Sequence, residues 1–388
     1  MAVLRFACGV APATQALTEK QLRNWKLLDQ FRRRLKPFLE AVPKSSSEQD
    51  PRREILAEDY FCLLLFGLFN PALKSMRALC HASGRFEKMR EVCSRPMTIA
   101  SFSEAQHVFD PQILVEVLRQ LAQEAKGRQE FGDLRVRQAI QALTIVDGTV
   151  LRALNRMAWA PAGGHGCAIK LHLHYSAFDQ LPEDWTITAG KVCERRTWKR
   201  KAQPGTFYVA DRLYSMDHRF LTQMQEQKID FVLRLQGNVI RTPVGPPRPL
   251  TPADHAAGVV SDRQERLGLA ENGPVVRVVE VHAAGKTFVL ITSREDLPAE
   301  IVGLIYRYRW QIELFFKWFK MILGCRHWLA ESPRGVALQL YSALIATLLL
   351  LLGTGYRPTK RQMEAVQLYF MSFATEDELM RELGFQKS

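Results

Sequence analysis

The feature that most constrains the fold is a succession of short β-branched segments between about residues 140 and 235. Five of them have the composition of strands, and a helical pattern at residues 215–227 separates the last two. The expected strands are residues 143–148, 170–175, 185–188, 206–211 and 230–235. Three strands, a possible helix, a strand, a helix and a strand predict a mixed sheet with helices on its faces, and hence an α/β fold.

Helical patterns dominate the chain before this region. A basic amphipathic helix is expected at residues 18–40 and an apolar core helix at residues 60–73. Ser101 and Glu104 stand in the order of a capping box, which predicts the start of another helix. Pro111 is expected at the first position of the helix that follows.

After this region the sequence pattern changes twice, first to a proline-rich and β-rich segment and then to helices. Five prolines in residues 238–252 predict a loop, and residues 275–282 and 286–292 predict a β-hairpin. One long helix is expected at residues 298–323 and a buried helix at residues 336–352. We therefore predict four parts: a helical N-terminal region at 1–138, an α/β domain at 139–236 and 298–355, a β-rich insertion at 237–297 and a helical tail at 356–388.

Charge and cysteine content narrow the class of protein. Lys and Arg number 53 against 40 Asp and Glu, so the net charge of +13 favours a polyanionic partner, either nucleic acid or an anionic membrane surface. The longest apolar stretch, residues 343–352, is shorter than the ~20 residues of a membrane span, which favours a buried helix. Seven scattered Cys without a CxxC pair argue for a reducing compartment rather than a disulfide framework.

Two of the expected strands end in an aspartate. Asp147 is followed by Gly148, and Asp211 follows Ala210 and precedes Arg212. Ligand sites gather at the ends of strands in α/β sheets. Taken alone, each aspartate has a simpler explanation, because Asp-Gly commonly forms a turn and Asp is favourable at the start of a helix.

A third acidic residue lies in the expected helix at 298–323. Tyr306, Arg309, Glu313 and Lys320 are spaced so that, at ~3.6 residues per turn, they lie along one face. An ion pair between residues four apart, such as Arg309 and Glu313, explains the spacing of the charges. It does not explain why a single Glu stands in so aromatic and basic a segment.

This spacing resembles the YREK pattern of DDE transposases of the insertion-sequence-four type. Asp147, Asp211 and Glu313 match the acidic triad that these enzymes carry on a ribonuclease-H-like fold, and a β-containing insertion before the Glu is typical of them. The resemblance covers about residues 100–350. It implies that the predicted α/β domain is a ribonuclease-H-like catalytic domain. It also implies a DNA transposase that binds terminal inverted repeats, cleaves the transferred strand and joins it to target DNA.

The resemblance further implies a divalent-metal site. Two Mg²⁺ ions ~3.5–4 Å apart can activate the attacking oxygen and stabilise the leaving oxygen, and Mg²⁺ prefers carboxylate and water ligands. By this analogy Asp147 bridges the two ions, while Asp211 and Glu313 each bind one, and Mn²⁺ can substitute. Tyr306, Arg309 and Lys320 are then expected to face DNA phosphates, Arg as a bidentate fork and Lys as a point charge.

The implied partners are the terminal repeats and target DNA, bound by a homodimer that does not associate with membrane. The implied location is the cytoplasm, with the nucleoid, and residues 1–138 are the candidate region for binding the DNA ends. One feature departs from the family pattern. Relatives carry a Trp in the insertion that stacks on a flipped base, and no Trp lies in residues 237–297 of this chain. Phe288 and His282 are the candidate replacements.

Two further groups of residues have weaker claims to function. His165, Cys167, His172 and His174 are close in sequence, but their spacing lacks the usual zinc patterns, and contact with DNA or solvent is favoured for the last two. Residues 191–201 hold six basic residues around Trp198, which fits a DNA-contacting surface and a solvated face equally well.

Two alternative functions share these features. A catalytically silent DNA-binding regulator derived from a transposase would bind DNA with a steep salt dependence but would never cut it. A ribonuclease-H-type nuclease would use the same metals but would lack end specificity and joined products. The intact acidic residues favour the transposase.

Overall fold

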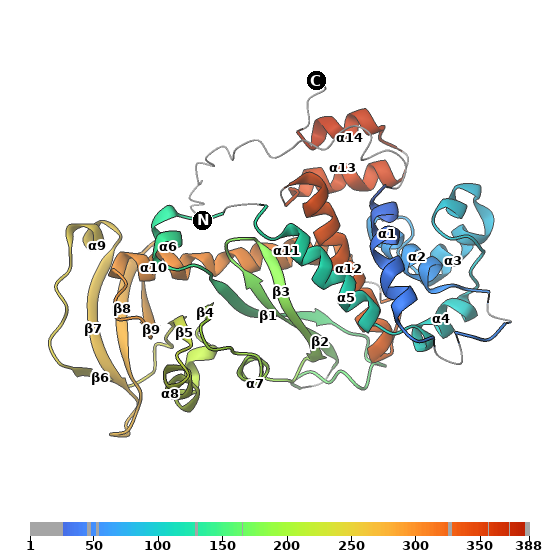
Figure 1. Cartoon of the computed structure of the whole chain (residues 1–388). Helices are drawn as coiled ribbons and strands as arrows, with labels where there is room; N and C mark the ends of the chain where they lie inside the picture. Colours follow the sequence, from blue (N-terminus) through green and yellow to red (C-terminus); the bar gives the residue numbers. More distant parts are fainter. Residues whose placement is uncertain are drawn as a thin grey trace. The chain divides into compact units, whose positions relative to one another are not determined.

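The structure of the chain is a computed structural model. Contacts within the chain divide it into two compact units: residues 1–128, 322–330 and 334–388, and residues 129–321 and 331–333. Figure 1 shows the elements of both units. The residues that the structure describes are 26–44, 48–51, 54–128, 131–164, 166–324, 328–355, 357–371 and 373–384.

The first unit is helical. Phe69 of α2 and Phe370 of α13 stack in its core, with ring centroids 5.0 Å apart. The expected helical N-terminal region and helical tail are confirmed. The elements are α1 (Lys26–Ala41), α2 (Ala57–Phe69), α3 (Met76–Arg85), the 3-10 helix η2 (Glu87–Glu91), α4 (Ile99–Val108), α5 (Gln112–Ala125), α12 (Pro333–Thr354), α13 (Lys360–Phe370) and α14 (Glu376–Glu382).

Three helix boundaries in this unit differ from the prediction. The helix expected at residues 60–73 ends at Phe69, before Pro71, because the residue that precedes a proline is disfavoured in helical conformation. Thr98, not Ser101, is the N-cap of α4, and Ser101 is the third residue of the helix that completes this capping box. Pro111 is the cap of α5 rather than its first residue. For the helix expected at residues 18–40, residues 18–25 lie outside the part of the chain that the structure describes.

The helix α12 is longer than the apolar stretch that predicted it. Its 22 residues pass a test of length and composition for crossing a membrane, and it is the one such helix in the described ranges. However, 83% of its most apolar 18-residue window is buried inside the protein. The prediction of a buried helix at residues 336–352 is therefore confirmed.

The second unit is built on a single nine-stranded sheet with the order β3-β2-β1-β4-β5-β9-β8-β7-β6. The first five strands in this order are β3 (Leu181–Ala189), β2 (Ala168–Ser176), β1 (Thr144–Arg152), β4 (Phe207–Ala210) and β5 (Asp230–Arg234). β1, β2 and β3 form an antiparallel meander, and β1, β4 and β5 are parallel. This mixed sheet flanked by helices confirms the predicted ribonuclease-H-like α/β fold.

Helices cover both faces of these strands (Figure 1). On one face, α7 (Glu194–Lys199) and α8 (His218–Glu226) bury Trp198 and Phe220 against Tyr208 and Phe231 of the sheet. On the other face lie α10 (Ala299–Tyr308) and α11 (Trp310–Leu323). The single helix expected at residues 298–323 is thus two helices, and the interruption falls at Arg309. The short elements α6 (Leu134–Ala139) and η3 (Tyr214–Met216) complete this part of the unit.

The predicted β-rich insertion is confirmed, and it continues the same sheet rather than forming a separate one. β9 pairs with β5, so the strands of the insertion extend the sheet beyond the ribonuclease-H-like part. The predicted hairpin is β8 and β9, joined at Ala283 and Lys286. The elements are β6 (Arg241–Val244), α9 (Pro252–Ala256), β7 (Val259–Leu267), β8 (Val275–Ala283) and β9 (Lys286–Thr292).

Candidate active site

The parallel pairing of β1 and β4 places the first two candidate acids at corresponding positions on adjacent strands. Val146 pairs with Ala210 at the last position of this ladder, and the residues that follow are Asp147 and Asp211. β4 ends there, but β1 continues to Arg152 because β2 pairs with it along its whole length. The prediction that a strand ends at Asp147 is therefore wrong, although the end of the parallel ladder still falls at this residue.

Asp147 is a carboxylate in a poorly solvated place. Burial is the largest effect on its pKa and raises it to about 7, and the nearby charges of Glu194 and Asp211 raise it further. The Gly148 N–H, which donates to Oδ1 of Asp147 at 2.8 Å, and the charge of Arg309 act in the opposite direction. Asp147 therefore lies near two other carboxylates and one cationic side chain, that of Arg309.

Asp211 is half-buried at the end of β4. Its Oδ1 accepts the backbone N–H of Arg212 at 2.7 Å. The hydroxyl of Tyr306, in α10, also donates to Oδ1, at a longer distance of 3.5 Å. The aromatic ring of Tyr306 is buried, and this burial raises the pKa of its hydroxyl. The sheet and α10 thus meet at this carboxylate.

Arg309 and Glu313 stand at the junction of α10 and α11. Nη1 of Arg309 donates to Oε1 of Glu313 at 2.7 Å, as the spacing of four residues predicts. The guanidinium is 14% exposed, and its buried Nε has no hydrogen-bond partner among the residues that the structure describes. Its positive charge acts on Asp147 and Asp211 as well as on Glu313. Arg309 therefore links the three acids electrostatically.

The structure brings five of the six predicted site residues into one region of the second unit. Asp147 and Asp211 come from the sheet, and Tyr306, Arg309 and Glu313 come from the two helices that cover it. The sixth, Lys320, is half-buried on α11, seven residues after Glu313. Two of the three candidate acids thus come from strands of the sheet or their ends, and the third comes from a helix.

A family model described as the transposase DDE domain matches residues 139–349, which is more than half of the chain. The chain belongs to this family. The match includes β1 to β9 and continues through α10 and α11 into α12.

Three curated relatives agree with this membership. Over 235 residues the chain is 30% identical to a probable transposase for an insertion sequence element of Geobacillus stearothermophilus, covering 60% of this chain and 61% of that protein. Over 219 residues it is 29% identical to a putative transposase of Sinorhizobium fredii, covering 55% and 61%. Over 263 residues it is 23% identical to a putative transposase for an insertion sequence element of Synechocystis, covering 65% and 70%. The matches thus span 61% of the length of the first two relatives.

A fourth carboxylate of this DDE domain, Glu194, escaped the sequence analysis. It is the first residue of α7, and its charge acts on Asp147. Its Oε1 lies 3.2 Å from Nζ of Lys170, and its Oε2 accepts the hydroxyl of Tyr214 at 3.2 Å. In the sequence Glu194 is one acid within a basic run, and nothing in that run indicates that it lies beside Asp147.

One prediction about this part of the DDE domain is wrong. His172 and His174 do not face DNA or solvent: both are buried, and burial lowers the pKa of each to about 4. His172 shares a 2.8 Å hydrogen bond with the hydroxyl of Thr188. In the basic run at residues 191–201, Trp198 is buried with its ring packed edge-on against Tyr214, and the choice between a DNA-contacting surface and a solvated face for this run stays open. His165, the first residue of the proposed histidine group, lies outside the described residues.

The donor chemistry of the site fits a hard divalent cation. Asp147, Asp211 and Glu313 offer only carboxylate oxygens, and burial together with the like charges of Glu194 and Asp211 raises the pKa of Asp147. Among the described residues, no group of three or more His, Cys, Asp or Glu side chains is arranged to hold a metal ion.

The insertion places one aromatic ring beside the candidate site. The ring of Phe288 in β9 lies 6.3 Å from the ring of Tyr306, measured between centroids, and the guanidinium carbon of Arg234 lies 4.9 Å from the centroid of the Phe288 ring. Of the two candidate replacements for the missing insertion Trp, Phe288 therefore adjoins Tyr306. His282 is exposed on β8, with Nδ1 3.3 Å from the hydroxyl of Thr287.

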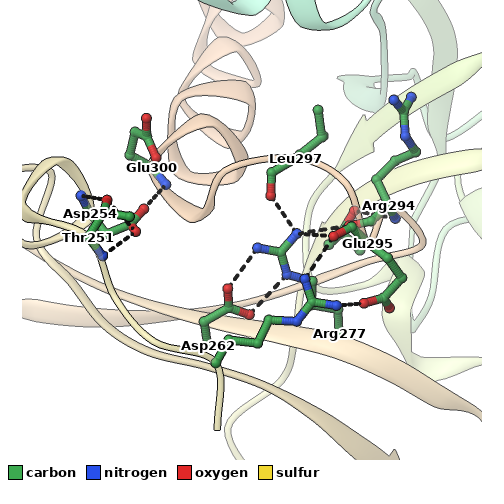
Figure 2. A network of polar contacts seen from close by, with 10 residues as sticks. Thr251, Asp254, Asp262, Arg277, Arg294, Glu295, Leu297 and Glu300 are labelled. Atoms are coloured by element: carbon green, nitrogen blue, oxygen red, sulfur yellow. Dashed lines mark hydrogen bonds and ion pairs between the residues drawn. The ribbon is translucent and has the colours of Figure 1, made fainter.

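The insertion also fixes the start of α10. Arg277 of β8 forms a bidentate ion pair with Asp262 of β7, at 2.9 and 2.7 Å, and donates to the backbone carbonyl of Leu297 at 2.6 Å (Figure 2). Asp254 of α9 accepts the backbone N–H of Glu300, in the first turn of α10, at 2.9 Å. These contacts tie the helix that carries Tyr306 to the strands of the insertion.

Proposed function

We propose that the chain is a DNA transposase that binds the terminal inverted repeats of its insertion sequence. In this proposal it hydrolyses a phosphodiester bond at the element end and transfers the strand to target DNA, with Asp147, Asp211 and Glu313 as the acidic triad. The observation that carries the proposal is the arrangement of these carboxylates. Two follow the last pair of a parallel ladder, and the third is joined to them by Arg309, whose charge acts on all three.

The proposed cofactor is Mg²⁺, as two ions, with Mn²⁺ as a substitute. Asp147 would bind both ions, and Asp211 and Glu313 would each bind one. When bound, the cations lower the pKa of the attacking water and neutralise charge on the leaving oxygen. The chain itself supplies the rigid frame, because Asp147 and Asp211 are held by backbone N–H groups of Gly148 and Arg212.

Tyr306, Arg309 and Lys320 are proposed to contact the phosphates of the DNA end. Support for Arg309 comes from its place beside the acids: its guanidinium is paired with Glu313, its charge acts on Asp211, and the side chain is 14% exposed. Phosphate oxygens suit such a planar donor. The net charge of +13 would strengthen this binding at low salt.

The wider assembly is part of the proposal. Residues 1–138 are proposed to bind the DNA ends, residues 139–236 and 298–355 to form the catalytic domain, and residues 237–297 and 356–388 to be the insertion and tail. The protein is proposed to act as a homodimer on DNA, without membrane, in the cytoplasm at the nucleoid. The transposase names of the relatives support DNA as the partner.

Cleavage of a labelled duplex tests the proposal. The duplex carries the DNA ends that flank this reading frame, and full-length protein is assayed in Mg²⁺ and in Mn²⁺. The natural protein is expected to nick specifically and leave a 3′-hydroxyl that joins to target DNA. Cleavage is expected to fall by roughly a thousandfold or more in each of three variants, Asp147→Asn, Asp211→Asn and Glu313→Gln. Each variant lacks one carboxylate ligand of the cations, which together stabilise the charge of the transition state by several kcal/mol.

Binding to the ends is the control for these variants. All three should retain end binding in a gel-shift assay, since the substitutions leave the N-terminal region unchanged. Full Mg²⁺-dependent cleavage by any one of them would contradict the assigned triad. End binding by the natural protein without cleavage in either metal would favour the silent regulator, and unspecific cutting without joined products would favour the nuclease.

A further inference from the structure

The side chain of Glu194 is fixed at both of its oxygens. It is 13% exposed, Oε1 is paired with Lys170 of β2, and Oε2 accepts the hydroxyl of the buried Tyr214. A glutamate on a short surface helix normally loses side-chain entropy when it is held in this way, and gains little from one ion pair. The two partners come from separate elements, so the carboxylate is placed by the fold rather than by its own helix.

The Glu194 carboxylate occupies the space that a side chain at Gly148, next to Asp147, would fill. A Cβ atom added to Gly148 would lie 3.0 Å from Cδ and 3.2 Å from Oε1 of Glu194. Gly148 has an ordinary strand conformation, since its φ is not in the left-handed region. A Cβ at this position would therefore force the Glu194 carboxylate to shift by a few tenths of an ångström, so the glycine matters for space rather than for backbone freedom.

This arrangement brings negative charge toward a carboxylate that already lacks compensation. Among the described residues, Glu194 is paired with Lys170 and Glu313 with Arg309, whereas Asp147 and Asp211 have no salt bridge. A poorly solvated carboxylate without a salt bridge destabilises the free protein unless a cationic ligand supplies the missing charge.

We propose that Glu194 is a positioning residue of the active site, which packs against Gly148 and supplies charge that increases the affinity of Asp147 for a divalent cation. The inference rests on the proposed function, in which Asp147 binds the cation. Glu194 does not contact the cation in this account, because both of its oxygens are already held by Lys170 and Tyr214. It acts through its charge and through the backbone of β1.

Calorimetric titration of the full-length protein with Mn²⁺ alone tests this inference. Glu194→Gln keeps the size of the side chain and its bond to Tyr214 but removes the charge, and is expected to weaken Mn²⁺ binding by about 10- to 100-fold. Glu194→Asp keeps the charge and is expected to retain more affinity than Glu194→Gln. A purely structural role predicts the reverse order. Glu124→Gln is the matched control, because Glu124 is also an ion-paired glutamate, 2.6 Å from Arg34, in the other unit.

Asp147→Asn in the same titration separates the two proposals. If it abolishes Mn²⁺ binding while Glu194→Gln binds like the natural protein, the role of Glu194 is overturned and the proposed function stands. If Asp147→Asn itself binds Mn²⁺ like the natural protein, the metal-binding role of Asp147 fails, and the role of Glu194 fails with it.

A double-mutant cycle gives a second, independent test. Gly148→Ala is expected to weaken Mn²⁺ binding because the new methyl group displaces the Glu194 carboxylate. In the background of Glu194→Ala, which empties the gap, Gly148→Ala is expected to have no further effect. Equal effects of Gly148→Ala in both backgrounds would overturn the inference, since they would show that the glycine is needed for a reason unrelated to Glu194.

Discussion

The second unit contains two clusters of charged residues that differ in how completely they are neutralised. The first surrounds Arg277, which is 2% exposed and donates to both oxygens of Asp262 and to the carbonyl of Leu297 (Figure 2). The second surrounds Asp147, which accepts one backbone N–H and lies near the like charges of Glu194 and Asp211. The first cluster satisfies its charges internally, and the second does not.

This difference separates a structural network from a candidate functional one. Buried charges that are fully paired hold elements in place, as Arg277 holds the segment that leads into α10. Buried carboxylates that remain short of positive charge are costly to the free protein and mark sites where a ligand is expected. The two clusters act on the same helices, since α10 carries Tyr306 and continues through Arg309 into the helix of Glu313.

The largest effect on stability is expected where pairing is complete. Arg277→Met should reduce the free energy of unfolding by about 3–5 kcal/mol, because it leaves the carboxylate of Asp262 buried without its partner. Urea denaturation followed by tryptophan fluorescence measures this change. Adding Asp262→Leu should recover most of the loss, since the orphaned charge is then removed. A stability unchanged by Arg277→Met would show that the network does not hold the insertion as described.

The opposite sign is expected at Asp147. Its pKa is about 7 in the folded protein and near 3.8 when unfolded, so between about pH 4 and 7 the folded state holds a proton that the unfolded state has lost. Stability therefore falls as the pH rises through this window and is lowest above pH 7. Asp147→Asn should remove this loss and be more stable than the natural protein at pH 8 by a few kcal/mol.

Urea denaturation in EDTA across pH 4.5 to 8 checks this prediction. The variant and the natural protein should have similar stability near the acidic end and should diverge as the pH rises. Asp262→Asn provides the contrast, because Asp262 is paired with Arg277 and its loss should be destabilising at pH 8. An Asp147→Asn variant that is less stable than the natural protein at pH 8 would break the comparison between the two clusters.

The smallest effect is expected at the exposed edge of the Arg277 cluster. Arg294 pairs with Asp296 at 2.6 Å, but the side chain of Asp296 is 64% exposed. Asp296→Asn should therefore change the free energy of unfolding by less than about 1 kcal/mol. The same denaturation assay measures it. A loss as large as that of Arg277→Met would mean that the strength of this network lies at its surface rather than in its buried ion pair.

The sequence alone predicted those secondary-structure elements and contacts that depend on residues close together in the chain. The β-branched runs and their order indicated the mixed sheet, and the four-residue spacing of Arg309 and Glu313 indicated an ion pair that the structure contains. The resemblance of Asp147, Asp211 and Glu313 to a known triad then narrowed the family, which the match over residues 139–349 confirms. The roles of the individual site residues stay predictions.

The features that sequence reasoning missed depend on contacts between distant segments. β1 extends past Asp147 because β2 pairs with it, and the insertion joins the main sheet because β9 pairs with β5. His172 was expected to face DNA or solvent, and Trp198 stands in a basic run, yet both side chains are buried. His172 bonds Thr188 of the neighbouring strand, and Trp198 packs on Tyr208, Tyr214 and Phe220. The proposed role of Glu194 depends on its packing against Gly148, which no local sequence pattern reveals.

The response of unfolding to Mg²⁺ tests the central claim most directly. Natural protein at pH 8 should be stabilised as Mg²⁺ is added, by about 2.7 kcal/mol at a concentration one hundred times the dissociation constant. Asp147→Asn should lose this stabilisation, and Asp296→Asn, at the edge of the other cluster, should keep it. Equal stabilisation of the natural protein and Asp147→Asn, or none in the natural protein with either Mg²⁺ or Mn²⁺, would contradict the assignment of the uncompensated carboxylates to a divalent-metal site.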